Sequence, residues 1–215
     1  MDLQNQHLDD LHEIRKIMQR SSRFLSLSGL SGIAAGVWAL AGAWLAFRRT
    51  NEYLIQEEQG PRHSAFQDLK NYLFFLAIAV LVLALLTAFY FTWRRAGKNK
   101  TPLWDHTARL LTLNMMIPLV AGGIFILTLL QYHEWRFVAP ACLIFYGLAL
   151  VNGSKYTLSD IRYLGIIEIV LGLVNTQYMG FGLIFWAVGF GVLHIIYGFL
   201  MWWKNERKPD RMSAS

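Results

Sequence analysis

Charge is scarce in this sequence and confined to short stretches. Only 16% of the 215 residues are charged and 55% are hydrophobic, whereas soluble domains carry roughly 25% charged residues. Long runs without any Asp, Glu, Lys or Arg separate the charged stretches. The single cysteine, Cys142, excludes an intrachain disulfide. The composition therefore argues against an ordinary soluble domain and predicts an all-α integral membrane protein.

Motifs of catalysis and of cofactor binding are also lacking. The chain has no Gly-x-Ser-x-Gly and no His-Glu-x-x-His. Five of the six histidines lie outside the apolar runs without metal-ligand spacing, and no lysine lies inside one. No basic face carries interleaved stacking aromatics, so the net charge of +6 does not indicate nucleic acid. We expect no catalytic residue, metal, cofactor or nucleic-acid partner, and whether the chain is an enzyme stays open, with a non-enzyme favoured.

Six apolar runs are long enough to cross a bilayer as helices, because about 30 Å of hydrocarbon needs roughly 20 helical residues. They lack the alternation of a barrel strand. The sequence predicts a polytopic bundle over residues 24–203, after a cytoplasmic segment 1–23 and before a basic cytoplasmic tail 204–215. The predicted spans are about 24–47, 72–93, 110–130, 137–154, 158–177 and 181–203.

The basic residues predict that both termini lie in the cytoplasm. With the N-terminus inside, fifteen of the 20 Lys and Arg residues fall on the inner side, as the positive-inside rule requires. The first outer loop, Arg48–Asn71, is an exception because it carries four bases, accompanied by four acids. Residues Leu8–Arg20 are patterned as a short amphipathic helix, which we expect to lie on the inner membrane surface.

The first span carries small residues at a spacing of four, namely Ser28, Gly32 and Gly36. Such a face lets another helix approach closely. Its partner is either a helix of the same chain or the first span of a second copy, which would give a homo-oligomer. The second span is almost uniformly bulky and apolar, so we expect it to face lipid.

Two ionisable residues lie inside the last two spans, Glu168 in the fifth and His194 in the sixth. A charged group does not face lipid profitably, so both should point inward. Glu168 lies about 9 Å beyond Arg162 and His194 about 15 Å from Lys204, which places them about 6 Å apart in depth. Glycines flank each of them on its own helix face and should let the helices close around the polar groups: Gly165, Gly172, Gly191 and Gly198.

The third span offers a further polar group. Pro118 cannot donate to the carbonyl of Asn114, so a backbone oxygen is freed beside a side-chain amide. Broken helices at this depth hold substrates or ions in transporters. Three aromatic residues are candidates to line the same cavity: Tyr146, Trp186 and Tyr197. The structural alternatives are an ordinary proline kink and a histidine that only bonds between helices.

The stretches Glu13–Met18, Phe24–Gly32 and Trp186–Gly198 resemble a group of small bacterial six-span integral membrane proteins to which no activity is attached. The resemblance implies a multi-pass protein of the bacterial inner membrane, embedded in its lipid bilayer. It implies no functional residue.

Three functions remain open. The favoured one is binding or transport of an unknown small ligand or ion at a polar intramembrane site in the fifth and sixth spans. The alternative is a non-catalytic sensor, scaffold or accessory subunit that acts through helix association. A lipid-modifying enzyme ranks last, because no nucleophile or metal set accompanies Glu168 and His194.

Overall fold

The computed structural model of the chain describes residues 28–57, 63–99 and 104–205, and within these ranges every regular element is a helix. Five helical runs are long and apolar enough to cross a membrane, so the chain is built as a multi-pass membrane protein. The expected amphipathic helix at Leu8–Arg20 and most of the tail 204–215 lie outside the described residues. The five runs are Gly29–Ile55, Phe66–Lys98, His106–Gln131, Trp135–Gly153 and Met179–Lys204.

The last run is continuous but not uniformly α-helical, because a π-helix interrupts it. The expected fifth span is the 16-residue helix α6, which is shorter than the other five runs. Short 3₁₀ turns, Trp135–Phe137 and Met179–Phe181, precede α5 and α7. The elements are α2 (Gly29–Glu57), α3 (His63–Asn99), α4 (His106–Gln131), α5 (Val138–Gly153), α6 (Asp160–Asn175), α7 (Gly182–Trp186), the π-helix (Ala187–Leu193) and α8 (His194–Asn205).

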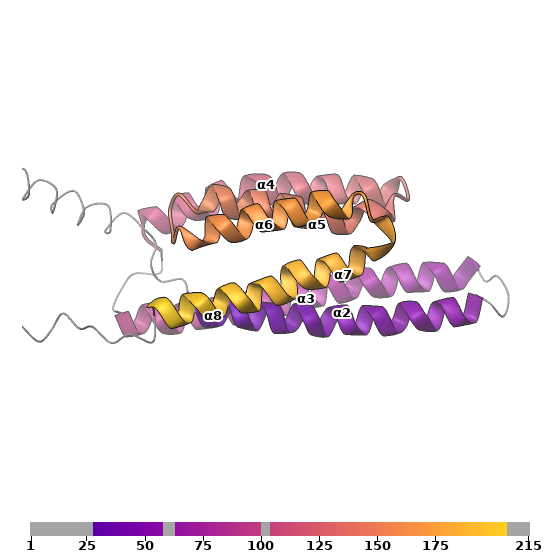
Figure 1. Cartoon of the computed structure of the whole chain (residues 1–215), viewed down its shortest axis with the longest axis horizontal. Coiled ribbons are helices and arrows are strands. Elements are labelled where there is room, and N and C mark those ends of the chain that lie inside the picture. The colour runs from indigo at the N-terminus through magenta and orange to yellow at the C-terminus, as the bar shows by residue number, and fades with distance from the viewer. Residues whose placement is uncertain (1–27, 58–62, 100–103, 206–215) are drawn as a thin grey trace, which may run out of the picture.

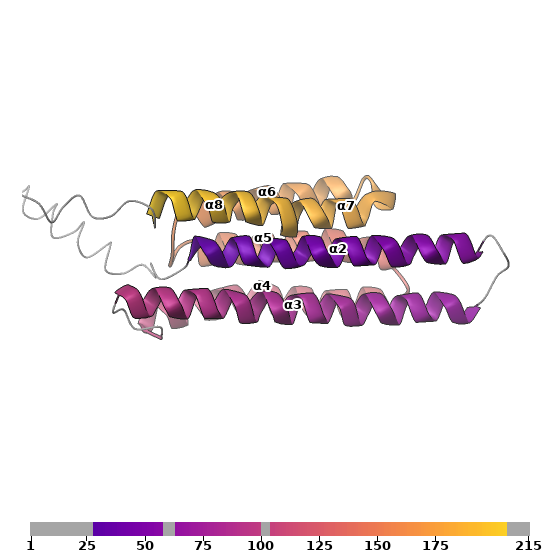
Figure 2. The same cartoon turned by 90° about the horizontal axis from the view of Figure 1, so that it is seen from below.

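The helices form two layers that the last run connects (Figure 1). One layer holds α4, α5 and α6, and the other holds α2, α3 and α8. The last run leaves the first layer at α7, which packs on α5, and joins the second through the π-helix and α8, which pack on α2. Successive helices run antiparallel, so the start of α2 and the end of α8 lie at the same end of the molecule (Figure 2).

The first two helices extend far beyond their apolar cores. The expected loop Arg48–Asn71 is helical up to Glu57 and again from His63. The sequence has no glycine or proline between Arg48 and Glu57, so no residue stops the helix there. Arg49 and Glu52 also form an ion pair of 3.1 Å along this stretch.

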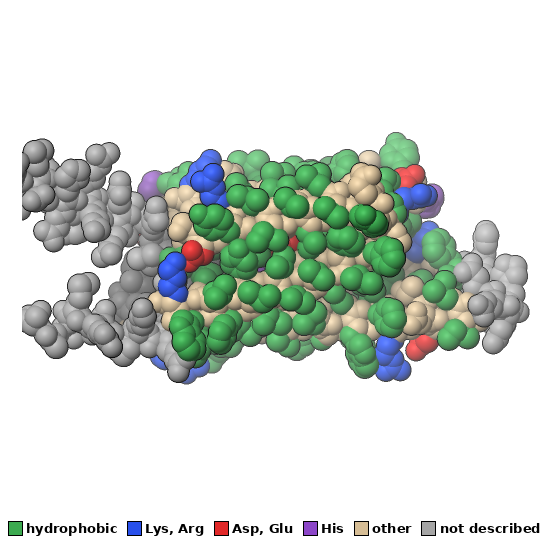
Figure 3. Space-filling view, in the orientation of Figure 1, with side chains coloured by type: hydrophobic (Ala, Val, Ile, Leu, Met, Phe, Trp, Pro, Cys, Tyr) green, Lys and Arg blue, Asp and Glu red, His purple; other side chains and the backbone are tan. Residues whose placement is uncertain are grey.

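Apolar side chains cover the outside of the helices, and charged ones gather at the two ends (Figure 3). The helix α3 packs mainly on α2 and exposes most of its large apolar residues. This exposure fits the expectation that the second span faces lipid.

The small residues of α2 contact the last run of the same chain. A Cβ added at Gly32 would lie 3.2 Å from Gly198 Cα, and one at Gly36 would lie 2.6 Å from the Gly191 carbonyl oxygen. Ser28 is buried at the start of this face, where its carbonyl accepts a bond from the Ser31 hydroxyl. The small-residue face of α2 is therefore covered by the last run of the same chain. A homo-oligomer through this face stays a prediction, and the structure leaves no free surface there for a second copy.

Candidate functional site

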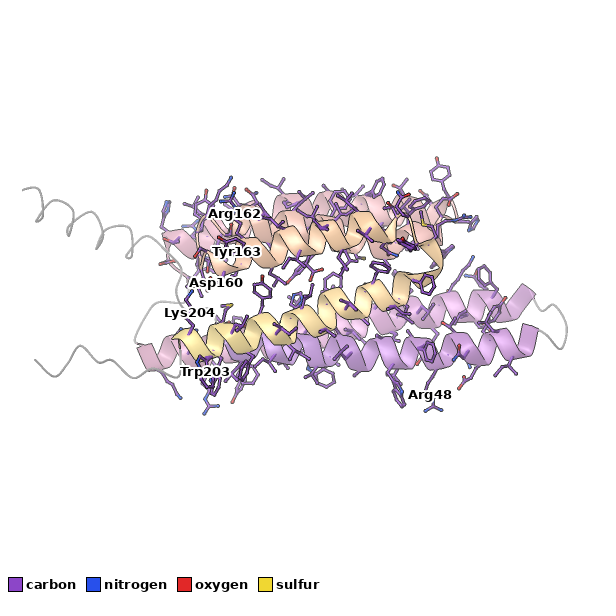
Figure 4. All side chains as sticks on the ribbon, viewed as in Figure 1. Arg48, Asp160, Arg162, Tyr163, Trp203 and Lys204 are labelled. Carbon is purple, nitrogen blue, oxygen red and sulfur yellow. The ribbon has the colours of Figure 1, made fainter. Side chains whose placement is uncertain are left out.

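Glu168, His194 and Tyr146 meet where the last run passes between the two layers. They come from α6, α8 and α5 respectively. Asp160 of α6 and Lys204 of α8 form an ion pair of 3.1 Å, so these two residues lie at the same height along the two helices (Figure 4). From this pair Glu168 is about 12 Å and His194 about 15 Å along its helix. The two depths differ by about half of the 6 Å expected, so the side chains can meet.

Both ring nitrogens of His194 have partners. Nδ1 lies 3.0 Å from the Gly189 carbonyl oxygen, and Nε2 lies 2.7 Å from the Tyr146 hydroxyl oxygen. A carbonyl only accepts, so Nδ1 carries a proton and donates to it. In the neutral ring, Nε2 then accepts from the Tyr146 hydroxyl. These bonds fix the ring between α5 and the π-helix.

Glu168 lies beside this ring with no hydrogen bond of its own. Its Oε1 is 3.6 Å from His194 Nδ1, which is too long for a hydrogen bond. Both carboxyl oxygens are buried without a partner among the described residues, and the side chain is 0% exposed, against 8% for His194. A buried polar group without partners costs free energy, more so when it is charged. The site is thus incomplete at Glu168.

Gly189 makes room for this carboxyl group. A Cβ added at Gly189 would lie 2.5 Å from Glu168 Oε2 and would also collide with Leu143 of α5. The residue belongs to the π-helix, an uncommon element that recurs at functional sites. One residue therefore supplies both the space for Glu168 and the carbonyl that holds His194.

Aromatic rings cover one side of the site. Phe190 lies 5.0 Å from Tyr146 and 5.9 Å from His194, measured between ring centroids. Trp186 reaches the group through Phe190, with its ring centroid 5.2 Å away. Tyr197 and Tyr146 both pack against a hydrophobic cluster that includes Leu150 and Met201. Of the three aromatic candidates, only Tyr146 bonds to an ionisable member of the site.

Asn114 belongs to a different polar group, between α4 and α5. The carbonyl that Pro118 leaves free accepts a bond of 2.8 Å from the Asn152 side-chain amide. The Asn114 amide donates to the Leu110 carbonyl of its own helix at 2.8 Å. The broken hydrogen bond in α4 is therefore repaired within the protein.

The glycines of α6 face α5. A Cβ at Gly165 would lie 2.7 Å from the Gly147 carbonyl oxygen, and one at Gly172 would lie 3.0 Å from that of Pro140. This close approach buries Glu168 between the helices.

Three residues of these polar groups escape the sequence analysis: Gly189, Phe190 and Asn152. Gly189 looks like one more small residue of an apolar run. Asn152 lies near the end of its span, where an amide is unremarkable. The sequence does hold one clue to Asn152. Pro118 leaves the Asn114 carbonyl without its helical donor, and Asn152 is a side-chain donor on the adjacent helix.

The residues that the structure describes contain no group of three or more His, Cys, Asp or Glu side chains that could hold a metal ion. Comparison with protein-family models, curated proteins and solved structures finds no match to the chain.

Proposed function

We propose that the chain is a six-span protein of the bacterial inner membrane that binds and transports a small ion at Glu168, His194 and Tyr146. One observation carries the proposal: the carboxyl group of Glu168 is buried between the two helix layers, and neither oxygen has a hydrogen-bond partner among the residues that the structure describes. Ionisable residues at such depth mark ion pathways more often than they serve packing.

The topology in this proposal needs α6 to cross the membrane as well, as the fifth of six spans. Its 16 residues reach about 24 Å, most of the roughly 30 Å hydrocarbon core. It runs antiparallel to α5, with Asp160 and Arg162 at the end where Lys204 lies (Figure 4). The bias of Lys and Arg places that end in the cytoplasm.

The alternative, a sensor, scaffold or accessory subunit, drew on the amphipathic N-terminal segment, the basic ends and the small-residue face of the first span, and only the last of these lies wholly among the described residues. That face packs against Gly191 and Gly198 of the same chain. A second copy would have to displace α8 to reach it, so ion binding is the better supported function.

Flux through liposomes tests the proposal. We expect purified protein to conduct H⁺, Na⁺ or K⁺ down an imposed gradient, and Glu168→Gln to abolish that flux at unchanged reconstitution. The matched control is Asp68→Asn, which removes an exposed acid on α3 outside the site and should leave flux intact. Equal flux with Glu168→Gln and wild type, or no flux of any of the three ions, would refute ion transport at this site.

A further inference from the structure

We propose that the ion is a proton carried on Glu168, and that its release transfers the His194 Nδ1–H bond from the Gly189 carbonyl to the Glu168 carboxylate. The inference rests on the proposed function and specifies its ligand. It begins from the position of one donor, Nδ1–H, beside two acceptors at 3.0 and 3.6 Å.

The surroundings of Glu168 suit a proton better than a metal cation, because they offer few oxygen ligands. The side chain is 0% exposed, and Gly189 and Leu143 close over it. Calcium takes six to eight oxygen ligands and magnesium an octahedral set. Glu168 offers two oxygens, and the neighbouring Gly189 carbonyl is already engaged by His194. A proton needs no coordination shell, only a water molecule that reaches the carboxyl group to deliver or accept it.

The distances around His194 Nδ1 fit a protonated Glu168 better than an ionised one. An ionised carboxylate beside an N–H donor forms a charge-assisted bond of about 2.7–2.9 Å. Here Nδ1 is closer to the neutral Gly189 carbonyl than to Glu168. The neutral acid also tolerates burial without partners far better than the anion does.

Release of the proton breaks the O–H bond of Glu168 and passes the proton to a water molecule that enters the site. The bonding electrons stay on the carboxylate. The anion then attracts the Nδ1–H of His194, and the Gly189 carbonyl loses its side-chain donor. Because Gly189 lies in the π-helix, the charge on α6 is coupled to the segment that joins the two layers.

The surrounding elements contribute few other titratable groups. From α5 these are Tyr146, which bonds to His194, and Cys142. From α8 they are His194, Tyr197 and the distant Lys204, which is paired with Asp160. Neither α7 nor the π-helix carries any titratable side chain. Glu168 is thus the acid that lies close enough to His194 for its charge to change the hydrogen bond of the ring.

Infrared difference spectroscopy on the full chain in nanodiscs tests the proton. We expect a band of a protonated carboxyl group that disappears reversibly as pH rises, that is lost in Glu168→Gln, and that persists in Asp160→Asn. Addition of NaCl or KCl at fixed pH should leave it unchanged. A missing Glu168-dependent band, or its loss on adding Na⁺ or K⁺, would overturn the assignment.

Nitrogen NMR of labelled histidine tests the transfer. The His194 Nδ1 shift should move with the carboxyl band in wild type and stay constant in Glu168→Gln, and a constant shift in both proteins would overturn the transfer. These measurements distinguish failure of this inference from failure of the proposed function. Flux of Na⁺ or K⁺ without a titrating carboxyl band would reject the proton as the ion and keep ion transport.

A titrating band without any flux would reject ion transport and keep the protonation of Glu168.

Discussion

Two of the polar groups in the described part of the helix bundle differ in how completely they are hydrogen-bonded. Between α4 and α5, the Asn114 carbonyl that Pro118 leaves free accepts a hydrogen bond from the Asn152 side-chain amide, and the Asn114 amide donates to the Leu110 carbonyl. At α6, the Glu168 carboxyl group stays unpaired although His194 lies 3.6 Å away. The sequence makes Glu168 attractive as an ionisable residue inside a span, and Asn114 as a side-chain amide beside a proline kink.

The difference separates structure from function. A completed hydrogen-bond group stabilises the fold and leaves nothing for a ligand to gain. An incomplete one leaves a group whose energy changes when a proton or ion arrives. We therefore assign the Asn114–Asn152 pair to packing and Glu168 to function, and this contrast can be tested by substitution.

The largest stability effect is expected at the space beside Glu168. Gly189→Ala places a methyl group against Glu168 and Leu143, which should cost about 1–3 kcal/mol of unfolding free energy. The control is Gly123→Ala on α4, where an added Cβ meets nothing within 4 Å. Denaturation in mixed micelles should show a loss only for the first variant, and equal stabilities would mean that the site is not closed around the carboxyl group.

The completed group should behave as a simple stability element. Asn152→Ala leaves the Asn114 carbonyl unpaired and should cost about 0.6–1.7 kcal/mol. In the Pro118→Ala background the backbone donor returns, so the same substitution should cost much less. Unfolding measured across the double-mutant cycle gives this coupling. Loss of ion flux in Asn152→Ala at full folding would contradict the assignment to packing.

The bond that holds the His194 ring is expected to contribute less. Tyr146→Phe removes one interhelical hydrogen bond and should cost about 0.6 kcal/mol, the average for such bonds in a membrane protein. Tyr163→Phe serves as its control, because Tyr163 is 61% exposed. A Tyr146→Phe variant as stable as its control, with an unchanged His194 nitrogen shift, would show that the hydroxyl does not hold the ring.

The smallest effect belongs to the ion pair at the helix ends. Lys204 and Asp160 are 66% and 30% exposed, so Lys204→Ala should cost between about 0 and 1 kcal/mol. Any loss should shrink at high salt, because exposed pairs are screened. A larger loss that persists in high salt would mean that the two layers depend on this pair for their alignment.

Much of the architecture follows from the sequence because lipid restricts the choices. Charge-free runs predict helices, since a backbone in hydrocarbon must pair internally. The rule that ionisable groups face inward places Glu168 and His194 toward each other. The difference in depth expected between Glu168 and His194 was too large. It was measured from Arg162, whereas Asp160 is the residue that pairs with Lys204.

The remainder depends on contacts that no local pattern encodes. The extensions of α2 and α3 lie in charged stretches, which hydrophobicity assigns to loops. The π-helix differs from an α-helix by a small change in winding over seven residues, Ala187–Leu193, which hydrophobic spacing does not resolve. Asn152 becomes informative only once α4 and α5 are known to be neighbours.

The wider winding of the last run has a consequence for how its length is constrained. Each residue advances an α-helix by about 100°, so one residue more or fewer redirects everything beyond it. Before the π-helix, α7 faces α5; after it, Gly198 faces α2. Loss of one residue within Ala187–Leu193 can be absorbed by rewinding the segment as an α-helix, which has fewer residues per turn. A deletion between Leu193 and Gly198 has no such reserve and would turn one of these faces away.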